Sequence, residues 1–589
     1  MGKTEIIELA FTTTELTSFV EELSAAQGMA AERRNKLLRE YPTVYVVHEP
    51  ADGQYEVYVG ETTDIVRRTQ THLTADPLTR GDWKKFADSP TSRMLVIGNE
   101  YFNKSLTLDV ENRLMLYLSG VASVKTLNNR RANPQRRYFS QQYFDAVFSE
   151  IWRSLRTHDK KLFPAEAIIR DSALFKASPF HKLTDEQVQA KDAIYEEIRK
   201  ALQSPQEPPS EMGHLILVEG AAGTGKTVLL SALFYELFQG GDSEADPFAF
   251  QDLDAHLLVN HDEQLTVYTQ IAQKLGLLQG GVERVGKPTR FINGRQPSLD
   301  ADVLLVDEAH LLWTQGKQSY RGTNQLEDLL RRAKVVVAVF DPQQTIAANQ
   351  YWESSQRAWL RDQTTIKLNQ QMRIHADPQT WQWIRRFVDE GQIEALPTDE
   401  RYDLRVFDSA PALHAAIKQR NAQQSHGLSR LTATFDWAYV SGREAPDGGK
   451  WEVTVDEWRL PWNRQHRGAR RDQRQLRGLS WAEQPHTIDE VGSIFTVQGF
   501  DLNYVGVIIG PSVKYRDGHI VFDSEASANR HATHKRSLLD GSKHDASEEL
   551  LRNQLNILLT RGVHGLYIFA VDDELQSALL QAQERRSPR

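Results

Sequence analysis

Gly220-Ala221-Ala222-Gly223-Thr224-Gly225-Lys226-Thr227 follows the apolar run His214-Leu215-Ile216-Leu217-Val218, and these two segments decide the fold. The eight residues match the P-loop pattern in full, and that pattern requires an apolar strand before it and a helix after it. Its glycines let backbone N–H groups surround phosphates, while Lys226 neutralises the β- and γ-phosphates and Thr227 binds Mg²⁺. We interpret the segment as a site for ATP and Mg²⁺, and we reject the alternative of a plain glycine turn before a helix.

Two carboxylates end a second apolar strand about 80 residues downstream of the P-loop. The segment runs Val303-Leu304-Leu305-Val306-Asp307-Glu308-Ala309-His310. At the end of a strand beside a P-loop, Asp307 is placed to hold Mg²⁺ through water, and Glu308 is placed to activate the attacking water. The alternative role for such acids is to cap a helix, but together with the P-loop they indicate ATP hydrolysis.

Four further residues are typical of a nucleotide site with two halves. The Gln187 amide can contact both the N7 and N6 edges of adenine, and Gln344, which follows another strand, can sense the γ-phosphate. Arg373 and Arg561 each follow a strand-like run, and two such arginines from a second half would stabilise transition-state charge. Hydrolysis would then depend on closure of the two halves. Taken singly, each arginine has an ordinary explanation as a surface residue.

Apolar strands alternate with helical segments from residue 181 onward, which predicts parallel sheets covered by helices on both faces. The expected strands cover residues 214–218, 257–260, 303–307, 335–341, 366–368, 431–440, 505–510 and 565–570. We expect two α/β units in this part of the chain, with their boundary near residue 350.

From Gln187 to Arg561 the order of motifs resembles superfamily-1 helicase-like ATPases with two RecA-like lobes. It is more closely similar to the Schlafen-group branch, long catalogued as a domain of unknown function. The residues that carry the resemblance are Val306–Leu311, Phe435–Trp437, Leu460–Asn463, Glu490–Gly492, Thr496–Asp501 and Leu558–Gly562. Not every member of this branch unwinds duplexes, so strand separation is one of several outputs that the resemblance implies.

The resemblance implies a role for each residue of the nucleotide site. It places Gln187 at adenine, Lys226 and Thr227 at phosphate and Mg²⁺, and Asp307 and Glu308 at metal and water. It makes Gln344 a coupling sensor and makes Arg373 and Arg561 arginine fingers. The nucleotide-binding residues that it implies are Gln187, Gly220, Gly223, Gly225, Lys226, Thr227, Gln344, Gln498, Gly499 and Asp501. Asp501 departs from the family, whose members usually carry glutamate near the ribose.

The N-terminal part of the chain carries a second set of chemical groups. Residues 5–40 are expected to be helical, and the runs 43–47 and 55–59 are expected to form a hairpin around the turn residues 49–53. A helix capped by Asp64 would place Arg68 and His72 on one face. A phosphodiesterase site needs a base, a cation and a carboxylate that holds a metal. Two tyrosines, Tyr45 and Tyr58, with Arg68 and with Glu111 in a helix over 109–118, supply these groups.

The ordinary explanation for such residues is cross-strand packing of the tyrosines and a solvated arginine. However, Thr43-Val44-Tyr45, Tyr58-Val59-Gly60, Arg68 and Glu111 together resemble the GIY-YIG nuclease family. The resemblance implies a nuclease with Tyr45, Tyr58, Arg68 and His72 as catalytic residues and with Glu111 as ligand of Mg²⁺ or Mn²⁺. Asn128 or Asn129 closes the site in this interpretation. Thr43 stands where the family usually has its first glycine, which concerns backbone geometry more than chemistry.

The expected fold class is α/β, with a small α+β GIY-YIG-like domain followed by two RecA-like parallel-sheet lobes. The expected segments are an N-terminal helical segment (1–37), the nuclease-like domain (38–150), a linker (151–180), the first lobe with the P-loop (181–348) and the second lobe (349–589).

Composition excludes several classes of protein. The 589 residues include no cysteine, which rules out disulfide scaffolds and thiolate metal sites. No apolar run reaches the roughly 18 residues of a membrane span, and we expect a cytoplasmic protein without membrane partners. The net charge of −9 means that nucleic acid would bind to local basic patches. The candidate patches are Arg464, Arg467, Arg470, Arg471, Arg474 and Arg477, and the smaller group Arg130, Arg131, Arg136 and Arg137.

Trp462 or Trp481 would stack on a base beside the larger patch, which has a solvated loop as its alternative explanation. The sequence therefore predicts an ATP-driven nuclease that acts on nucleic acid, with DNA favoured over RNA, possible protein partners and a setting in defence against foreign nucleic acid. One alternative is an ATPase switch that gates the nuclease or a partner without translocation. Another is a binding module with an inactive nuclease fold.

Overall fold

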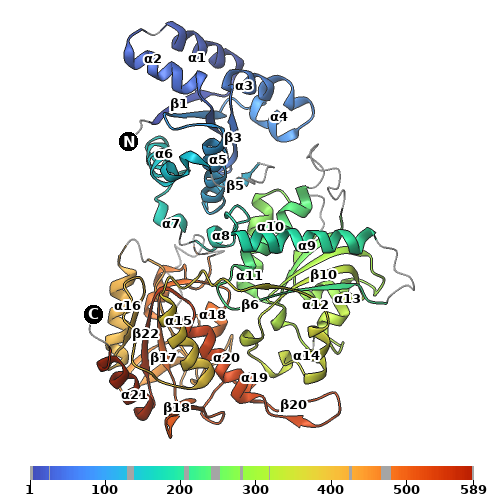
Figure 1. Ribbon diagram of the computed structural model, residues 1–589, viewed down its shortest axis with the longest axis vertical. Helices are drawn as coiled ribbons and strands as arrows, with labels where there is room; N and C mark the ends of the chain where they lie inside the picture. The colour runs from blue at the N-terminus through green and yellow to red at the C-terminus, as the bar shows by residue number, and fades with distance from the viewer. Residues whose placement is uncertain are drawn as a thin grey trace. The chain divides into compact units, whose positions relative to one another are not determined.

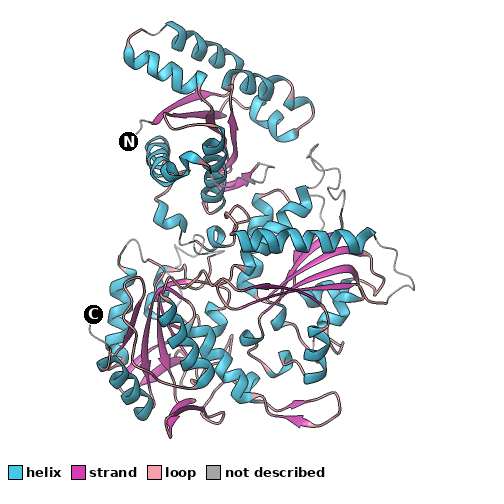
Figure 2. Cartoon of the chain, in the orientation of Figure 1, coloured by secondary structure: helices cyan, strands magenta, loops and turns pink. Residues whose placement is uncertain are grey.

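The computed structural model describes residues 4–25, 27–128, 138–170, 172–203, 211–239, 253–278, 283–316, 319–423, 427–465, 476 and 479–586. The chain forms two compact units, whose helices and strands are shown in Figures 1 and 2. One unit comprises Met1–Lys182, Ser231–Asp252 and Val267–Arg284, and the other comprises Leu183–Leu230, Leu253–Thr266 and Val285–Arg589. Within the described ranges, no helix combines the length and apolar character needed to cross a bilayer.

A mixed five-stranded sheet forms the centre of the N-terminal unit, in the order β1-β4-β2-β3-β5. The strands are β1 (Thr4–Ala10), β2 (Thr43–Ala51), β3 (Gln54–Thr62), β4 (Arg93–Asn99) and β5 (Val124–Leu127). The predicted hairpin is confirmed as β2 and β3, which are antiparallel with Tyr45 opposite Gly60 and Val47 opposite Tyr58. Tyr45 and Tyr58 therefore project from the same face of neighbouring strands.

The helices of this unit include those expected to carry the candidate nuclease residues. They are α1 (Thr13–Ala25), α2 (Met29–Asn35), α3 (Ile65–Thr74), α4 (Gly81–Asp88), α5 (Lys104–Ser119), α6 (Phe144–His158), α7 (Glu166–Arg170) and α8 (Ala173–Lys176). The expected cap of α3 is confirmed, because the Asp64 carboxylate accepts a hydrogen bond from the Arg67 backbone N–H at 3.0 Å. The helix predicted over 109–118 is confirmed within α5.

The prediction of a helix from residue 5 is wrong for the first residues. Thr4–Ala10 forms β1, which pairs antiparallel with β4 from Thr4 opposite Asn99 to Ala10 opposite Arg93. Helical spacing of apolar residues is a local signal, and the free edge of β4 supplies a distant partner that outweighs it. The first segment is thus part of the sheet, and the predicted separation at residue 37 does not exist.

Residues 151–180 are also part of this unit and not a linker. Side chains of α6 and of the segment after it are buried against α5, among them Ile151, Trp152, Leu155, Leu162 and Phe163. Trp152 also donates from Nε1 to the Pro164 carbonyl at 2.9 Å. The prolines and lysines of the segment indicated a connection, but its apolar residues complete a core.

The first lobe has a six-stranded sheet in the order β11-β6-β10-β9-β7-β8, in which all pairs are parallel. The strands are β6 (His214–Gly220), β7 (Ala255–Val259), β8 (Val285–Gly286), β9 (Ala301–Asp307), β10 (Ala333–Phe340) and β11 (Thr364–Leu368). The helices in this part of the sequence are α9 (Asp185–Gln203), α10 (Lys226–Gln239), α11 (Asp262–Lys274), α12 (Pro288–Gly294), α13 (Gln325–Leu330) and α14 (Ser354–Arg361). The predicted boundary after residue 348 is wrong, because β11 pairs with β6 and closes this sheet.

The second lobe has a parallel sheet in the order β12-β22-β17-β13-β16. The strands are β12 (Asp403–Val406), β13 (Arg430–Ala433), β16 (Val491–Gly492), β17 (Leu502–Ile509) and β22 (Gly562–Ala570). The helices are α15 (Pro378–Arg385), α16 (Ala410–Asn421), α18 (Ile494–Val497), α19 (Arg530–Thr533), α20 (Ser547–Leu559) and α21 (Asp573–Glu584). The hairpins are β14 (Glu452–Val455) with β15 (Trp458–Pro461), β18 (Val513–Arg516) with β19 (His519–Phe522), and β20 (Arg536–Ser537) with β21 (Lys543–His544).

Alternate residues of β22 show how this sheet is covered on both faces. Leu566 and Ile568 pack with side chains of α15, α20 and α21, while Tyr567 and Phe569 pack with α16. The expected fold class is therefore confirmed: two parallel-sheet lobes follow a small domain with a mixed sheet. The strand expected over 431–440 is shorter than predicted and ends at Ala433.

The predicted base-stacking role of Trp462 and Trp481 is wrong. Their side chains are 0% and 1% exposed, so neither ring face is accessible to a base. Trp481 donates from Nε1 to Glu490 at 2.8 Å inside the second lobe. Of the predicted basic patches, only Arg464 is described. Asn129, Arg130, Arg131, Arg136, Arg137, Arg467, Arg470, Arg471, Arg474 and Arg477 lie outside the described residues.

Replacing Trp152 by alanine should destabilise the N-terminal unit by about 3–5 kcal/mol, because a large buried ring and its hydrogen bond are lost. The measurement is the free energy of unfolding in urea. Phe139→Ala is the matched control, because the Phe139 ring in the same unit is 96% exposed. Equal stability of the two variants would restore the interpretation of residues 151–180 as a linker.

Candidate functional site

The P-loop connects the end of β6 to the start of α10 in the backbone shape that phosphate binding requires. Gly223 and Gly225 have φ angles of +87° and +77°, which favour glycine. A Cβ atom at Gly223 would lie 2.6 Å from the Cβ of Arg373, and one at Gly220 would lie 2.5 Å from the Thr224 hydroxyl. The glycines are therefore needed both for conformation and for space, and the loop fits a triphosphate.

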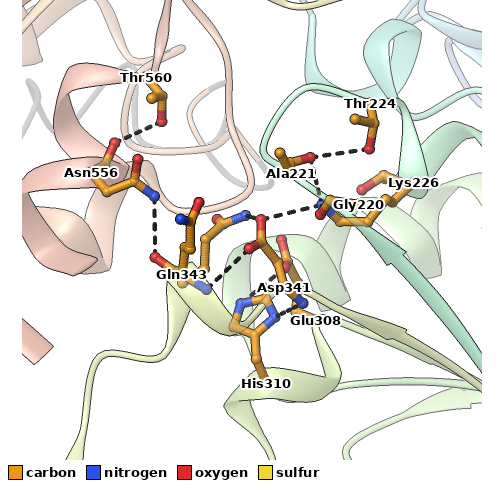
Figure 3. A network of polar contacts seen from close by, with 12 residues as sticks. Gly220, Ala221, Thr224, Lys226, Glu308, His310, Asp341, Gln343, Asn556 and Thr560 are labelled. Atoms are coloured by element: carbon orange, nitrogen blue, oxygen red, sulfur yellow. Dashed lines mark hydrogen bonds and ion pairs between the residues drawn. The ribbon is translucent and has the colours of Figure 1, made fainter. Parts of the chain in front are cut away.

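Lys226 lies at the centre of this loop, in a ring of oxygen atoms (Figure 3). Its ammonium donates to the carbonyl oxygens of Gly220 at 2.6 Å and Ala221 at 2.9 Å, and it lies 3.4 Å from an Asp341 carboxylate oxygen. The side chain is buried, so a fixed positive charge faces the phosphate-binding loop from inside.

Thr227 and Asp307 bring two oxygen ligands together beside the loop. The Thr227 hydroxyl lies 3.4 Å from Asp307 Oδ2, and Asp307 Oδ1 accepts from the Glu308 backbone N–H at 2.9 Å. Mg²⁺ is usually held by one or two protein oxygens together with substrate phosphates and water. The pair fits that ion, and Thr227 and Asp307 remain the predicted ligands of Mg²⁺.

Glu308 is buried and held in an unusual backbone conformation. Its φ angle is 50°, in the left-handed region that costs a residue with a side chain about 1 kcal/mol or more. Gln264 donates to one carboxylate oxygen at 3.2 Å, and His310 Nε2 lies 3.2 Å from the other. Burial raises the pKa of Glu308, but His310, Lys226 and Arg561 outweigh burial and bring the pKa below its ordinary value. Glu308 is therefore an anion able to accept a proton.

A chain of polar contacts connects the P-loop lysine to an arginine of the second lobe. Asp341 Oδ2, beside Lys226, accepts from Gln344 Nε2 at 2.6 Å, and Gln344 Oε1 accepts from Arg561 Nη2 at 2.8 Å. We call the four residues Lys226, Asp341, Gln344 and Arg561 the relay. Burial, followed by the nearby Arg373 charge, lowers the pKa of Arg561 to about 9, which leaves it charged at neutral pH.

Helix α20 fixes the geometry of the relay from the second lobe. Asn553 donates to the carbonyl oxygens of Pro342 and Thr345, and Asn556 donates to that of Gln343 at 3.2 Å (Figure 3). Arg561 follows the end of this helix, so the strand-like run expected before it is wrong. The helix positions Arg561 through contacts with the turn that carries Gln344.

Arg373 also lies at the P-loop. The backbone N–H of Met372 donates to the Gly223 carbonyl at 2.8 Å, and the Arg373 side chain forms an ion pair with Asp501. Asp501 thus contacts Arg373, and its place near the ribose stays a prediction. The ion pair joins a segment after β11 to a segment before β17.

Two other predicted nucleotide residues lie between Asp501 and α18. Gly499 has a φ angle of +81°, and a Cβ atom there would lie 2.6 Å from Gln264 Nε2. The Gln498 side chain is 1% exposed, and its Nε2 has no hydrogen-bond partner among the described residues. An unpaired buried amide of this kind suits a ligand with an acceptor atom.

Gln187 contacts the P-loop through its side-chain amide. Its Oε1 accepts from the Thr184 backbone N–H at 2.9 Å, and its Nε2 donates to the Thr224 carbonyl at 3.3 Å. The amide is therefore oriented by the protein itself. Contacts connect most of the residues predicted for this site, namely Gln187, Gly220, Gly223, Gly225, Lys226, Thr227, Asp307, Glu308, Gln344, Arg373, Gly499, Asp501 and Arg561. Gln498 is buried next to Gly499 in the sequence, but its Nε2 has no hydrogen-bond partner in the part of the chain that the structure describes.

Sequence reasoning missed three members of this site. Asp341 directly follows β10, the strand that pairs with β6. An acid at the end of such a strand is a sequence signal from which its place in the site could have been predicted. His310 lies two residues after Glu308 in the sequence. Gln264 lies on a helix with no local motif, so only the tertiary structure reveals its contact with Glu308.

The N-terminal unit brings a second group of predicted residues together. The rings of Tyr45 and Tyr58 are 6.1 Å apart between centroids, and the half-buried Arg68 guanidinium acts electrostatically on both tyrosines. Burial and the Tyr58 hydroxyl raise the pKa of Tyr45 well above its ordinary value, and burial also raises that of Tyr58. Glu111, buried on α5, acts electrostatically on both tyrosines.

His72 is the fifth predicted member of this group. Its Nε2 lies 2.7 Å from the Tyr45 hydroxyl, and its Nδ1 lies 2.5 Å from Asp76 Oδ2. Burial, then the positive charges of Arg68 and Arg80, lower the pKa of His72, so the ring is neutral at neutral pH, while the Asp76 carboxylate beside Nδ1 favours the uptake of a second proton. Asp76 and the neighbouring Trp83 had not been predicted. The spacing of Asp76, one helical turn after His72, was a signal that could have found it.

Replacing Gln344 by alanine should slow ATP hydrolysis roughly 10- to 100-fold while ATP binding is retained, because the two hydrogen bonds that join Asp341 to Arg561 through Gln344 are lost. The measurements are steady-state phosphate release and equilibrium ATP binding. Gln343→Ala is the matched control, since its side chain is exposed. Unchanged hydrolysis in Gln344→Ala would contradict the role of the relay.

The match to a known protein family lies mainly in the second unit of the chain. Residues 213–572 match the family described as Schlafen group 3, DNA/RNA helicase domain. This range contains the P-loop, Asp307, Glu308 and all four residues of the relay. The protein YPL245W of Saccharomyces cerevisiae, described as uncharacterized, is 33% identical over 406 residues, which are 63% of this chain and 85% of the yeast protein.

Two solved structures share limited similarity with the chain. AMPPCP-bound DnaA from Aquifex aeolicus has 16% identity and a TM-score of 0.17 over 33% of this chain and 49% of DnaA. The DUF1998 helicase MrfA bound to DNA and AMPPNP has 9% identity and a TM-score of 0.28 over 69% of this chain and 51% of MrfA. The chain spans about half the length of these two proteins. Because the family match covers more than half of the 589 residues, the chain belongs to the Schlafen group 3 family of DNA/RNA helicase domains.

Proposed function

We propose that this protein is an ATP-dependent nucleic-acid-processing enzyme, in which a helicase-like ATPase acts together with a GIY-YIG-type endonuclease. The observation that carries the ATPase part is the relay, which joins a P-loop lysine to an arginine of the second lobe through the Lys226–Asp341 ion pair and two hydrogen bonds. Such a connection couples the occupancy of the nucleotide site to the arrangement of the lobes.

The side chains of the nucleotide site have different roles in ATP hydrolysis. Glu308 orients a water and accepts its proton, and its buried, anionic state suits that role. Arg373 and Arg561 stabilise negative charge that develops on the phosphates. Thr227 and Asp307 would hold Mg²⁺, which supplies further charge neutralisation. Gln187 would contact the adenine of ATP.

The endonuclease part of the proposal is supported by the convergence of polar groups in the N-terminal unit. Arg68 is placed to stabilise the charge of a pentacovalent phosphate, and Tyr45 and His72 form a hydrogen-bonded pair that can accept a proton. Glu111 would hold a divalent metal, Mg²⁺ or Mn²⁺. The substrate is nucleic acid, in keeping with the family, and we favour DNA over RNA. Defence against foreign nucleic acid, with other proteins as partners, is the setting that we propose.

A second candidate function is an ATP switch that gates the nuclease without translocation. The observation that favours it is Arg536, whose side chain is 1% exposed within the second unit. From the β20–β21 hairpin it donates to the Thr314 hydroxyl at 2.5 Å and to Glu353 at 3.1 Å, both residues of the first lobe. A buried charge held in this way resists separation of the lobes. Strong resistance fits a switch better than a motor that opens in every cycle.

Replacing Glu308 by glutamine should reduce ATP hydrolysis on the order of 10²- to 10⁴-fold and leave ATP binding intact, because the proton acceptor is lost while its shape is kept. The measurement is phosphate release with and without single- and double-stranded DNA and RNA. Glu211→Gln, at the amino end of β6 and exposed, is the control. A normal rate in Glu308→Gln would overturn the assignment, and ATP-dependent cleavage that survives in this variant would favour the switch.

Replacing Arg68 by alanine should slow cleavage of nucleic acid roughly 10²- to 10³-fold, since a donor to the transition-state charge is lost. Glu111→Ala should abolish cleavage in both Mg²⁺ and Mn²⁺, because the proposed metal ligand is lost. The measurement is single-turnover cleavage in each metal, with Arg67→Ala, an exposed neighbour on α3, as control. Equal cutting by all variants and the wild type would dismiss the nuclease, leaving a binding module.

A further inference from the structure

His72 has two partners that the proposed nuclease mechanism leaves unexplained. Asp76 lies 2.5 Å from Nδ1, and the Trp83 ring is stacked on the imidazole with 3.5 Å between centroids and 14° between planes. His72 and Trp83 are both 0% exposed. Tyr58 closes a third side, with its ring 5.6 Å from the imidazole in an edge arrangement. The imidazole is thus fixed in position, in plane and in rotation.

The hydrogen-bond partners determine where the single proton of the neutral ring lies. An ionised carboxylate can only accept hydrogen bonds, so Nδ1 beside Asp76 must carry the proton. Nε2 is then without a proton and can only accept. The Tyr45 hydroxyl, 2.7 Å away, must therefore donate to it. The positive charge of Arg68, which can only donate hydrogen bonds, acts electrostatically on the same hydroxyl.

We propose that Asp76 is a positioning residue that keeps His72 in the Nδ1–H tautomer, while Trp83 keeps the ring in plane, so that the Tyr45 hydroxyl always points its proton at His72. Asp76 touches neither substrate nor metal in this proposal and acts only through His72. The inference deepens the proposed nuclease function and, for its catalytic consequence, rests on it.

The consequence for catalysis is that the Tyr45 oxygen keeps a lone pair for an incoming proton. When an attacking water gives a proton to this oxygen, the proton of Tyr45 passes to Nε2 of His72. The water oxygen bonds to phosphorus, the phosphorus–oxygen ester bond breaks, and the leaving oxygen takes a proton from solvent. His72 then returns its extra proton to solvent. With the other tautomer, Nε2–H would donate to Tyr45, and the transfer would have no acceptor.

The first test measures the tautomer directly in the full-length protein. Imidazole ¹⁵N spectra of histidine-labelled protein distinguish the two tautomers by the shift of each ring nitrogen, and the His72→Gln variant identifies the signal. The wild type should show protonated Nδ1 and bare Nε2 at neutral pH. The Nε2–H tautomer in the wild type would overturn the inference, without any reference to a variant or to activity.

The second test replaces Asp76 by asparagine, whose amide group can donate to Nδ1 and so favours the opposite tautomer. The ¹⁵N shifts of His72 should exchange, and kcat for cleavage should fall about 10- to 100-fold with little change in KM. Asp88→Asn, an exposed residue of α4, is the control and should keep the wild-type spectrum. Asp76→Glu should restore the Nδ1–H signal, which separates loss of positioning from loss of folding.

The two tests distinguish failure of this inference from failure of the proposed function. An unchanged His72 tautomer in Asp76→Asn would refute the positioning role even if the protein cuts nucleic acid. The expected exchange of tautomers in a protein that shows no cleavage by the wild type would support the positioning role of Asp76 and refute the nuclease.

Discussion

The contact between Lys226 and Asp341 is the interaction on which the nucleotide site depends. Lys226 has to be buried at the P-loop, and a buried charge is tolerated only when an opposite charge or hydrogen-bond partners compensate for lost water. Asp341 supplies that charge from the neighbouring strand β10, and Gln344 and Arg561 extend the compensation into the second lobe. The need to satisfy one ammonium group thus links two lobes that are far apart in the sequence.

The same physical rule organises the N-terminal unit. The Tyr45 hydroxyl, the His72 ring and the Asp76 carboxylate form a line of hydrogen bonds in which each polar atom has a partner. Trp83 fills the remaining space around the imidazole, so the line has no freedom to rearrange. In both units the predicted site residues are polar groups whose orientation is set by contacts with further residues around them.

Local patterns predicted those parts of the fold that local physics controls. The P-loop, the strand ending in Asp307 and the Asp64 cap were found because each needs particular residues at fixed short spacing. The failures share a different cause. β1 was taken for a helix, β11 was separated from its sheet by the boundary at 348, and Trp462 was expected at the surface. Each of these depends on a partner distant in the sequence, such as the free edge of β4 or of β6.

The order of the motifs was enough to predict an α/β chain with a P-loop, a pair of acids and two arginines, because backbone conformation and residue chemistry depend on residues close together in the sequence. Only the tertiary structure decided that Asp341 and Gln344 join Lys226 to Arg561, and that Asp76 and Trp83 hold His72. Burial and hydrogen-bond partners depend on which residues surround a side chain in the folded protein. When those residues come from different strands and helices, no regular spacing in the sequence predicts their contact.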